Sequence, residues 1–161
     1  KEIVEAIRSR VTNNFIVGLR FSQWKQHDFD AKLAQTPDEL EKVIMPPVNA
    51  GLDYLHSSMR RFWESEFPDS KENLAYWTKK ISDITTIGVG SVGLDSDFID
   101  MMAPANPTSI DKAIKDISSN KYELIAVGRA LISDPNWVIK MKEGRFDELI
   151  PYTKESLLTL Y

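Results

Sequence analysis

Residues 123–137 read ELIAVGRALISDPNW, and this stretch decides the fold. A short apolar run ends at Gly128 and Arg129, and Asp134 followed by Pro135 then gives a start signal for a helix. Similar apolar runs recur about every 32 to 38 residues, a spacing that suits one strand and one helix. They lie at residues 15–21, 52–58, 84–92 and 122–131. Their nearly continuous hydrophobicity is typical of parallel strands buried on both faces, so the sequence predicts an α/β fold of parallel βα units.

Helix signals separate these runs. Thr36 is expected to cap a helix, because Pro37 occupies its first position and Glu39 lies three residues after the cap. Pro46 and Pro47 remove two backbone donors and are expected to kink or restart that helix. The sequence therefore predicts a helix with a well-marked start and an interrupted end.

Four further helices are expected along the rest of the chain. Ser70 is the predicted cap of one helix, and residues 109–117 form a second, with Ile114 on its apolar side. The helix that Asp134 and Pro135 open is expected to end at Gly144 in the left-handed conformation. A last short helix is predicted over residues 154–161.

Composition limits the class of protein. The chain has 161 residues, 42% of them hydrophobic, and residues 1–161 are read as one domain or part of one. The formal charge is −4 and basic residues are scattered, which argues against a nucleic-acid partner. No cysteine is present, so disulfides, thiolate metal sites and thiol catalysis are excluded. No apolar run reaches the roughly 18 residues that a membrane span needs, and we expect a cytoplasmic protein.

The start of the chain suggests a longer parent protein. The sequence begins at Lys1, without a methionine, and opens inside a helical pattern. We expect that the chain is a fragment.

The carboxyl ends of parallel strands share one rim, which gathers the candidate site residues. The GVGS sequence (residues 88–91) and the pair Gly128 and Arg129 have the composition of a phosphate cradle, in which glycines expose backbone N–H groups and a following helix adds its positive end. Arg129 offers a forked donor set to phosphate. The alternative is a rim arginine that pairs with an acidic loop residue.

Arg20 is a second candidate. It lies inside an apolar strand, and an unpaired buried guanidinium would be costly, so it must find a ligand or an internal carboxylate. His27 and His56 show no metal-ligand spacing and are read as structural, and Trp24 is read as a packing residue. No metal site is predicted.

The order of these motifs resembles the carboxyl-terminal half of the old yellow enzyme family of FMN-dependent oxidoreductases, over nearly the whole chain. The resemblance implies strands five to eight of a TIM (β/α)8 barrel with FMN at the carboxyl ends of the strands. It rests on GLRFSQW, LDYLHSS, TIGVGSV, ELIAVGRALISDPNWVIKMKEG and LIPY, in that order.

The resemblance also implies roles for five residues. Gly90 and Ser91 match the strand-seven turn that holds the FMN phosphate, and Gly128 and Arg129 match the strand-eight turn that completes it. Arg20 matches the arginine at the flavin pyrimidine edge, where it would stabilise negative charge on the reduced ring.

The implied activity is hydride transfer from NADH or NADPH through FMN to a small electron-poor acceptor. The amino-terminal half of such an enzyme carries the substrate-binding pair that includes a histidine and the tyrosine proton donor, so no catalytic residue is assigned here. We expect this piece alone to be inactive. It would pair with the missing amino-terminal half barrel or with another copy, because an open half barrel leaves two strand edges and an apolar face unpaired.

Two alternatives stay open. The chain could be a non-catalytic half-barrel fragment that binds a phosphate-bearing ligand, or a self-contained flavodoxin-like domain. Strand order separates the latter from a half barrel, because a doubly wound sheet reverses direction at a switch point.

Overall fold

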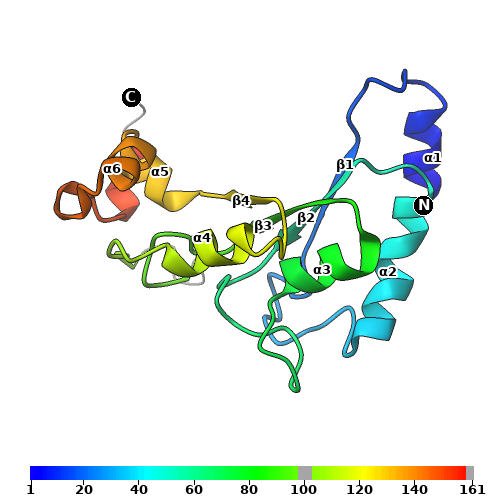
Figure 1. Ribbon diagram of the computed structural model, residues 1–161, viewed down its shortest axis with the longest axis horizontal. Coiled ribbons are helices and arrows are strands. Elements are labelled where there is room, and N and C mark those ends of the chain that lie inside the picture. Colours follow the sequence, from blue (N-terminus) through cyan, green and yellow to red (C-terminus); the bar gives the residue numbers. More distant parts are fainter. Residues whose placement is uncertain (98–102, 159–161) are drawn as a thin grey trace.

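A computed structural model describes residues 1–97 and 103–158 of the chain (Figure 1). The described residues form one sheet of four parallel strands in the order β1-β2-β3-β4. The strands are β1 (Gly18–Phe21), β2 (Tyr54–Ser58), β3 (Thr85–Val89) and β4 (Leu124–Ala126). The predicted parallel α/β fold is confirmed. Because neighbours in the sequence are neighbours in the sheet, the sheet has no switch point, and the flavodoxin-like alternative is wrong.

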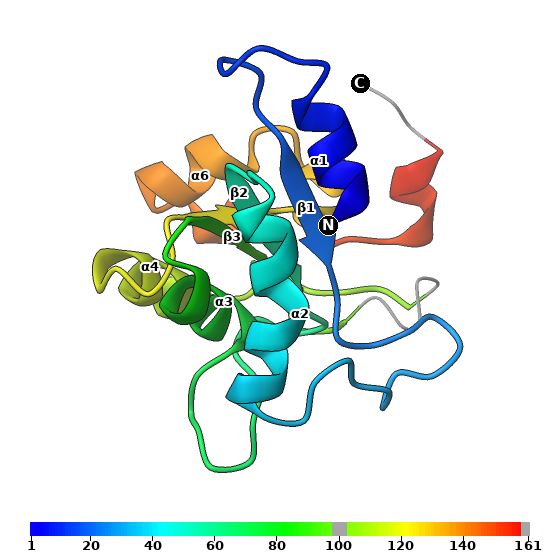
Figure 2. The same ribbon diagram turned by 90° about the vertical axis from the view of Figure 1, so that its right-hand side faces the viewer.

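One face of the sheet is covered by helices α2 (Pro37–Asn49) and α3 (Leu74–Ser82), which lie side by side (Figures 1 and 2). Leu55 of β2 is fully buried, together with Leu40 and Ile44 from α2. The hydroxyl of Ser57 on β2 donates to Thr78 of α3 at 2.9 Å. The main core therefore lies between the sheet and these two helices.

The opposite face of the sheet is open. Residues that pair in register across parallel strands point to the same side, and one such row contains Arg20, His56, Ile87 and Leu124. Arg20 is exposed, and Leu124 keeps 52% of its surface accessible. The prediction that every strand is buried on both faces is thus wrong for β1 and β4, because no described element covers this side of them.

The helix α1 (Glu2–Arg8) is attached to the sheet through Arg8. Its guanidinium donates to the carbonyl oxygen of Gly51 at 2.6 Å and pairs with the carboxylate of Asp53. The backbone N–H of Val17 also donates to Asp53, at 2.6 Å. These two donors, the Val17 amide first and Arg8 second, hold the pKa of Asp53 below its usual value.

The helix signals are confirmed at some positions and wrong at others. Thr36 caps α2 by accepting from the backbone N–H of Glu39 at 3.2 Å, as predicted. The predicted restart is wrong, because α2 runs through Pro46 and Pro47, which lie near its carboxyl end. The predicted cap of α3 is also wrong: Asn73 accepts from the N–H of Tyr76 at 2.9 Å.

The predicted helix over residues 109–117 is α4 (Asp111–Ser118), and Ile114, expected on its apolar side, is 53% exposed. The segment that links β3 to α4 includes residues 98–102, which lie outside the described part. Among the described residues of this segment, the backbone of Ala105 pairs with Tyr152 in both directions at 2.9 Å.

The chain after β4 forms a small second core beside the sheet. It contains α5 (Arg129–Ser133), α6 (Trp137–Glu143) and two short 3-10 helices, Phe146–Glu148 and Lys154–Leu157. Gly144 ends α6 with a φ of 71°, as predicted. The predicted helix over residues 154–161 is a 3-10 turn over the described part, and residues 159–161 lie outside it. The buried members of this second core are Leu94, Ala105, Ala130, Trp137 and Tyr152.

Candidate functional site

A cavity of about 230 Å³ opens at the carboxyl ends of the strands, and it brings together all five residues that the sequence singled out. We call it the rim cavity. It is lined by Arg20, Trp24, Ser58, Met59, Val89, Gly90, Ser91, Val92, Leu94, Gly128 and Arg129. All four strands contribute, either through their last residues or through the turns that follow.

Arg129 is the main polar group of the rim cavity. One guanidinium nitrogen, NH2, donates to the carbonyl oxygen of Ser96 and to the hydroxyl of Ser91 at 3.3 Å. The guanidinium also lies 5.3 Å from the ring centroid of Tyr152. The other nitrogen, NH1, is buried and has no hydrogen-bond partner among the residues that the structure describes. Burial lowers the pKa of Arg129 from its usual value. A buried donor without an acceptor is costly, so this nitrogen is suited to an anionic ligand.

The turn after β3 holds Gly90 and Ser91 in place through its contacts with the loop after β2. The backbone N–H of Phe62 donates to the carbonyl oxygen of Gly90 at 3.1 Å. A Cβ atom on Gly90 would lie 2.8 Å from the carbonyl oxygen of Met59, so only glycine fits. Ser91 has a φ of 51°, a left-handed conformation that costs energy for a residue other than glycine.

Gly128 leaves open space beside the cavity, since a Cβ built there meets nothing within 4 Å. This position has room for a ligand to approach the backbone. The predicted helix start is present after β4, where Gly128 is the N-cap of the five-residue helix α5, but it is wrong after β3, because the first described helix there is α4, which begins at Asp111. The donors that the rim cavity offers to a ligand are therefore mainly Arg129 and backbone N–H groups.

Arg20 differs from its sequence-based description. It is exposed rather than buried, so its burial does not require a partner. Its NH2 donates to the hydroxyl of Ser58 at 3.1 Å, and the described residues supply it with no carboxylate. The internal salt bridge is therefore wrong. His56, its neighbour in register, has its pKa lowered by burial and by the charge of Arg20.

Trp24 is a site residue that sequence reasoning missed. The indole Nε1 of Trp24 donates to the carbonyl oxygen of Ser58 at 3.1 Å, which fixes its ring at the edge of the rim cavity. The available signal was position: Trp24 lies three residues after β1, where α/β proteins place functional loops.

Residues 1–97 and 103–158 contain no group of three or more acidic or histidine side chains placed to hold a metal ion. Within the same residues, no helix has the length and apolar character that crossing a membrane requires.

The family model for the NADH:flavin oxidoreductase / NADH oxidase family matches residues 1–148. The chain belongs to this family. A relative described as an NADH oxidase from Thermoanaerobacter brockii is 30% identical over 156 residues, which is 92% of this chain and 21% of that protein. A probable NADH-dependent flavin oxidoreductase of Bacillus subtilis is 26% identical and is matched over 89% of this chain and 34% of its own length. The chain thus spans about a fifth to a third of these relatives.

Two solved structures show the same fold. Histamine dehydrogenase from Rhizobium aligns with a TM-score of 0.60 and 18% identity, over 92% of this chain and 20% of its own. Morphinone reductase in complex with tetrahydroNAD aligns with a TM-score of 0.52 and 16% identity, over 80% of this chain and 29% of its own. The open four-stranded sheet is therefore a parallel α/β unit of the kind found in this family's TIM-barrel proteins.

The residues of the rim cavity fit a flavin of this family. The unpartnered Arg129 nitrogen can donate to a phosphate oxygen, the open side of Gly128 leaves space for it, and Arg20 presents an exposed charge on the same cavity.

Proposed function

We propose that the chain forms strands five to eight of a TIM barrel and supplies the phosphate and pyrimidine side of the FMN site in an NAD(P)H oxidoreductase of the ene-reductase type. The observation that carries this proposal is Arg129, which lines a cavity together with the glycine turns and whose buried NH1 has no partner among the described residues. A permanently charged, forked donor in that position suits a phosphate.

Each site residue has a physical task in this proposal. Arg129 binds the phosphate, and Ser91 keeps the guanidinium in place through the 3.3 Å contact with its hydroxyl. Gly90 and Gly128 let the backbone approach the ligand. Arg20, steadied by Ser58, sets a fixed positive charge where the pyrimidine edge of the flavin would lie. FMN, when bound, supplies the hydride chemistry that links NADH or NADPH to a small electron-poor acceptor.

In this proposal, a second half barrel covers the open face of the sheet. β1 and β4 each pair on one side, and Leu124 is half exposed on β4. Four further βα units, from an amino-terminal half barrel, would pair with both edges and bury this face. The substrate side of the active site would come from that half, and this chain alone would not catalyse the reaction.

The second candidate is a non-catalytic half barrel that binds a phosphate-bearing ligand. It is favoured by the content of the rim cavity, whose lining includes neither histidine nor tyrosine to handle a substrate proton. If the protein binds FMN but does not oxidise NADH, even with the amino-terminal half present, the non-catalytic half barrel is the correct function.

The test is an FMN titration, followed by quenching of flavin fluorescence, of the wild type, Arg129→Gln and a control, Arg145→Gln. Arg145 lies between α6 and the 3-10 helix Phe146–Glu148 and pairs with Glu143 and Glu148, both exposed. We expect Arg129→Gln to weaken FMN binding about tenfold or more, since a charge-assisted contact contributes about 1.5–3 kcal/mol, and Arg145→Gln to leave it unchanged. Equal FMN affinities of the wild type and Arg129→Gln would refute the proposal.

A further inference from the structure

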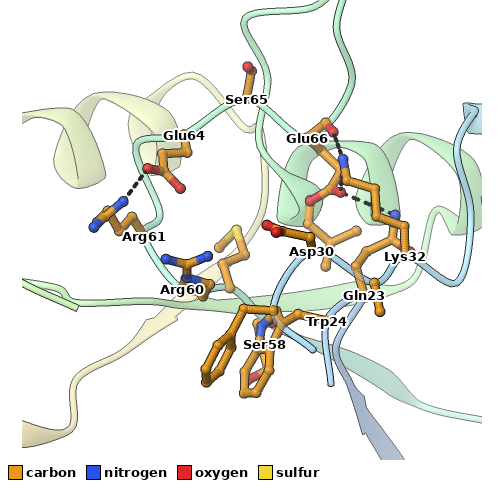
Figure 3. A pocket seen from close by; sticks show the side chains of 14 residues that line it. Gln23, Trp24, Asp30, Lys32, Ser58, Arg60, Arg61, Glu64, Ser65 and Glu66 are labelled. Atoms are coloured by element: carbon orange, nitrogen blue, oxygen red, sulfur yellow. Dashed lines mark hydrogen bonds and ion pairs between the residues drawn. The ribbon is translucent and has the colours of Figure 1, made fainter. Parts of the chain in front are cut away.

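Arg129 is held differently from Arg60 and Arg61, the two arginines of the loop after β2. Arg60 pairs with Asp97 at 3.1 Å, and Arg61 pairs with the same carboxylate at 3.0 Å and with Glu64 at 2.7 Å. Figure 3 shows the Arg61–Glu64 pair beside a cavity of about 240 Å³ between the loops after β1 and β2. A carboxylate at this distance neutralises a guanidinium. Arg129 has no ion pair with the described residues, so its charge is left for a ligand.

The ring of Tyr152 holds Arg129 without neutralising it. The guanidinium carbon lies over the ring, 5.3 Å from its centroid, which is within the range of a cation–π contact. The NH2 group of Arg129 donates to the carbonyl oxygen of Ser96 and to the hydroxyl of Ser91. These two bonds fix one corner of the planar guanidinium, and the ring restricts the tilt of its plane. Together they set the direction of NH1, which has no partner among residues 1–97 and 103–158.

Tyr152 is itself held in place from two sides. Its backbone pairs with Ala105 in both directions at 2.9 Å, and its side chain is fully buried in the small second core. Two residues earlier, the carbonyl oxygen of Ile150 accepts from the hydroxyl of Ser133 at 3.2 Å, and the N–H of Ile150 donates to Asp134 at 3.3 Å. The ring is therefore a fixed support, built from chain segments that lie outside the rim cavity.

The ring of Tyr152, and not its hydroxyl, makes this contact useful. The hydroxyl is buried and has no hydrogen-bond partner in the part of the chain that the structure describes. Tyr152 does not line the rim cavity, so it does not contact a ligand there directly. Removing a buried hydroxyl that lacks a partner costs little or no stability. Phenylalanine should therefore replace this tyrosine without loss, whereas a residue without a ring should not.

We propose that Tyr152 is a positioning residue of the phosphate site, whose ring fixes the guanidinium of Arg129 so that NH1 donates to the phosphate of the flavin. This inference rests on the proposed function, because it names the side chain that prepares that site for the phosphate. Its signature is selective. Loss of the ring weakens the binding of a flavin that carries a phosphate and leaves the binding of the same ring system without phosphate unchanged.

The test titrates FMN and riboflavin, followed by quenching of flavin fluorescence, into the wild type, Tyr152→Phe and Tyr152→Leu. We expect Tyr152→Leu to bind FMN about fivefold more weakly and riboflavin as the wild type does, since one partly desolvated cation–π contact is lost. Tyr152→Phe should bind both flavins as the wild type does. In an Arg129→Gln background, Tyr152→Leu should cause no further loss of FMN affinity, because the two side chains act as a unit.

The matched control is Tyr122→Leu. Tyr122 is 1% exposed in the main core, and its hydroxyl also lacks a partner among the described residues. The control removes a ring of the same size away from Arg129, so the ratio of the FMN and riboflavin affinities should not change.

NMR of the Arg129 Nε–H, assigned with Arg129→Gln, tests the contact without any flavin. A group over an aromatic ring has its signal moved upfield. We expect this displacement, relative to the protein unfolded in urea, in the wild type and in Tyr152→Phe. This measurement does not depend on whether Tyr152→Leu folds.

Four results would overturn the inference. They are an equal loss of affinity for both flavins in Tyr152→Leu, a weaker FMN affinity in Tyr152→Phe, an undisplaced Arg129 signal in the wild type, and an FMN affinity that falls in Arg129→Gln but not in Tyr152→Leu. The last result would leave the proposed function standing. Equal FMN affinities of the wild type and Arg129→Gln would instead remove the proposed function, and this inference with it.

Discussion

The buried ion pair between Asp134 and Lys140 gives the most demanding stability prediction. Asp134 is 1% exposed and Lys140 is 9% exposed. The Asp134 carboxylate accepts from Lys140 Nζ at 2.8 Å, and from the backbone N–H groups of Asn136 at 3.1 Å and Ile150 at 3.3 Å. One side chain thus joins the start of α6 to the segment that follows the 3-10 helix.

Replacing Asp134 with Asn removes the negative charge, so the buried ammonium group of Lys140 is left with neutral acceptors only, among them the carbonyl oxygen of Glu148 at 2.9 Å. Breaking a buried pair from one side costs about 3–5 kcal/mol, so we expect Asp134→Asn to lose about 3 kcal/mol of unfolding free energy. In urea this corresponds to a fall of roughly 1–1.5 M in the midpoint. The double variant Asp134→Asn with Lys140→Met removes the stranded charge and should recover part of the loss.

Urea unfolding followed by tryptophan fluorescence measures the effect, because Trp137 lies in the same small core. The control Asp147→Asn changes an exposed carboxylate and should stay within about 0.5 kcal/mol of the wild type. An Asp134→Asn protein as stable as this control would show that the pair does not stabilise the fold, and so would a double variant that is less stable than the single one.

Two further predictions concern the rim and the attachment of α1. Gly90→Ala should destabilise the protein by about 1–3 kcal/mol and weaken FMN binding, because the new methyl group would lie 2.8 Å from the Met59 carbonyl oxygen. Gly128→Ala should not affect urea unfolding, because a methyl group there meets nothing within 4 Å. The pKa of Asp53 is lowered by folding. The stability that its carboxylate contributes is therefore present at pH values above the usual pKa of 3.8 and is lost as the pH falls through the folded-state pKa. The difference in urea midpoint between wild type and Asp53→Asn should therefore vanish in strong acid; a difference that grows as the pH falls would contradict this assignment.

Local signals predicted much of the fold. The four apolar runs gave the strands, because a short apolar run between helix signals has few other structures to adopt. Thr36 and Gly144 were read correctly since a helix cap depends on its own few residues. Ser70 was wrong because Asn73, three residues later, is an equally good cap, and the loop before α3 decides between them.

The exposure of the sheet could not be read from its sequence. Leu124 and Arg20 have the pattern of a strand buried on both sides, yet both are exposed, since none of the described elements packs over that side of β1 and β4. The same limit applies to the site. The glycine turns and Arg129 were predicted from strand ends, whereas the part played by Trp24 depends on a loop that folds back over Ser58.

In the proposed function, Arg129 and the glycine turns bind the phosphate of FMN. The most direct test compares the affinities of the protein for FMN and riboflavin, which share the same ring system and differ in the phosphate. We predict that FMN binds about tenfold or more tightly than riboflavin, and that Arg129→Gln removes most of this difference. Equal affinities for the two flavins in the wild-type protein would contradict the account.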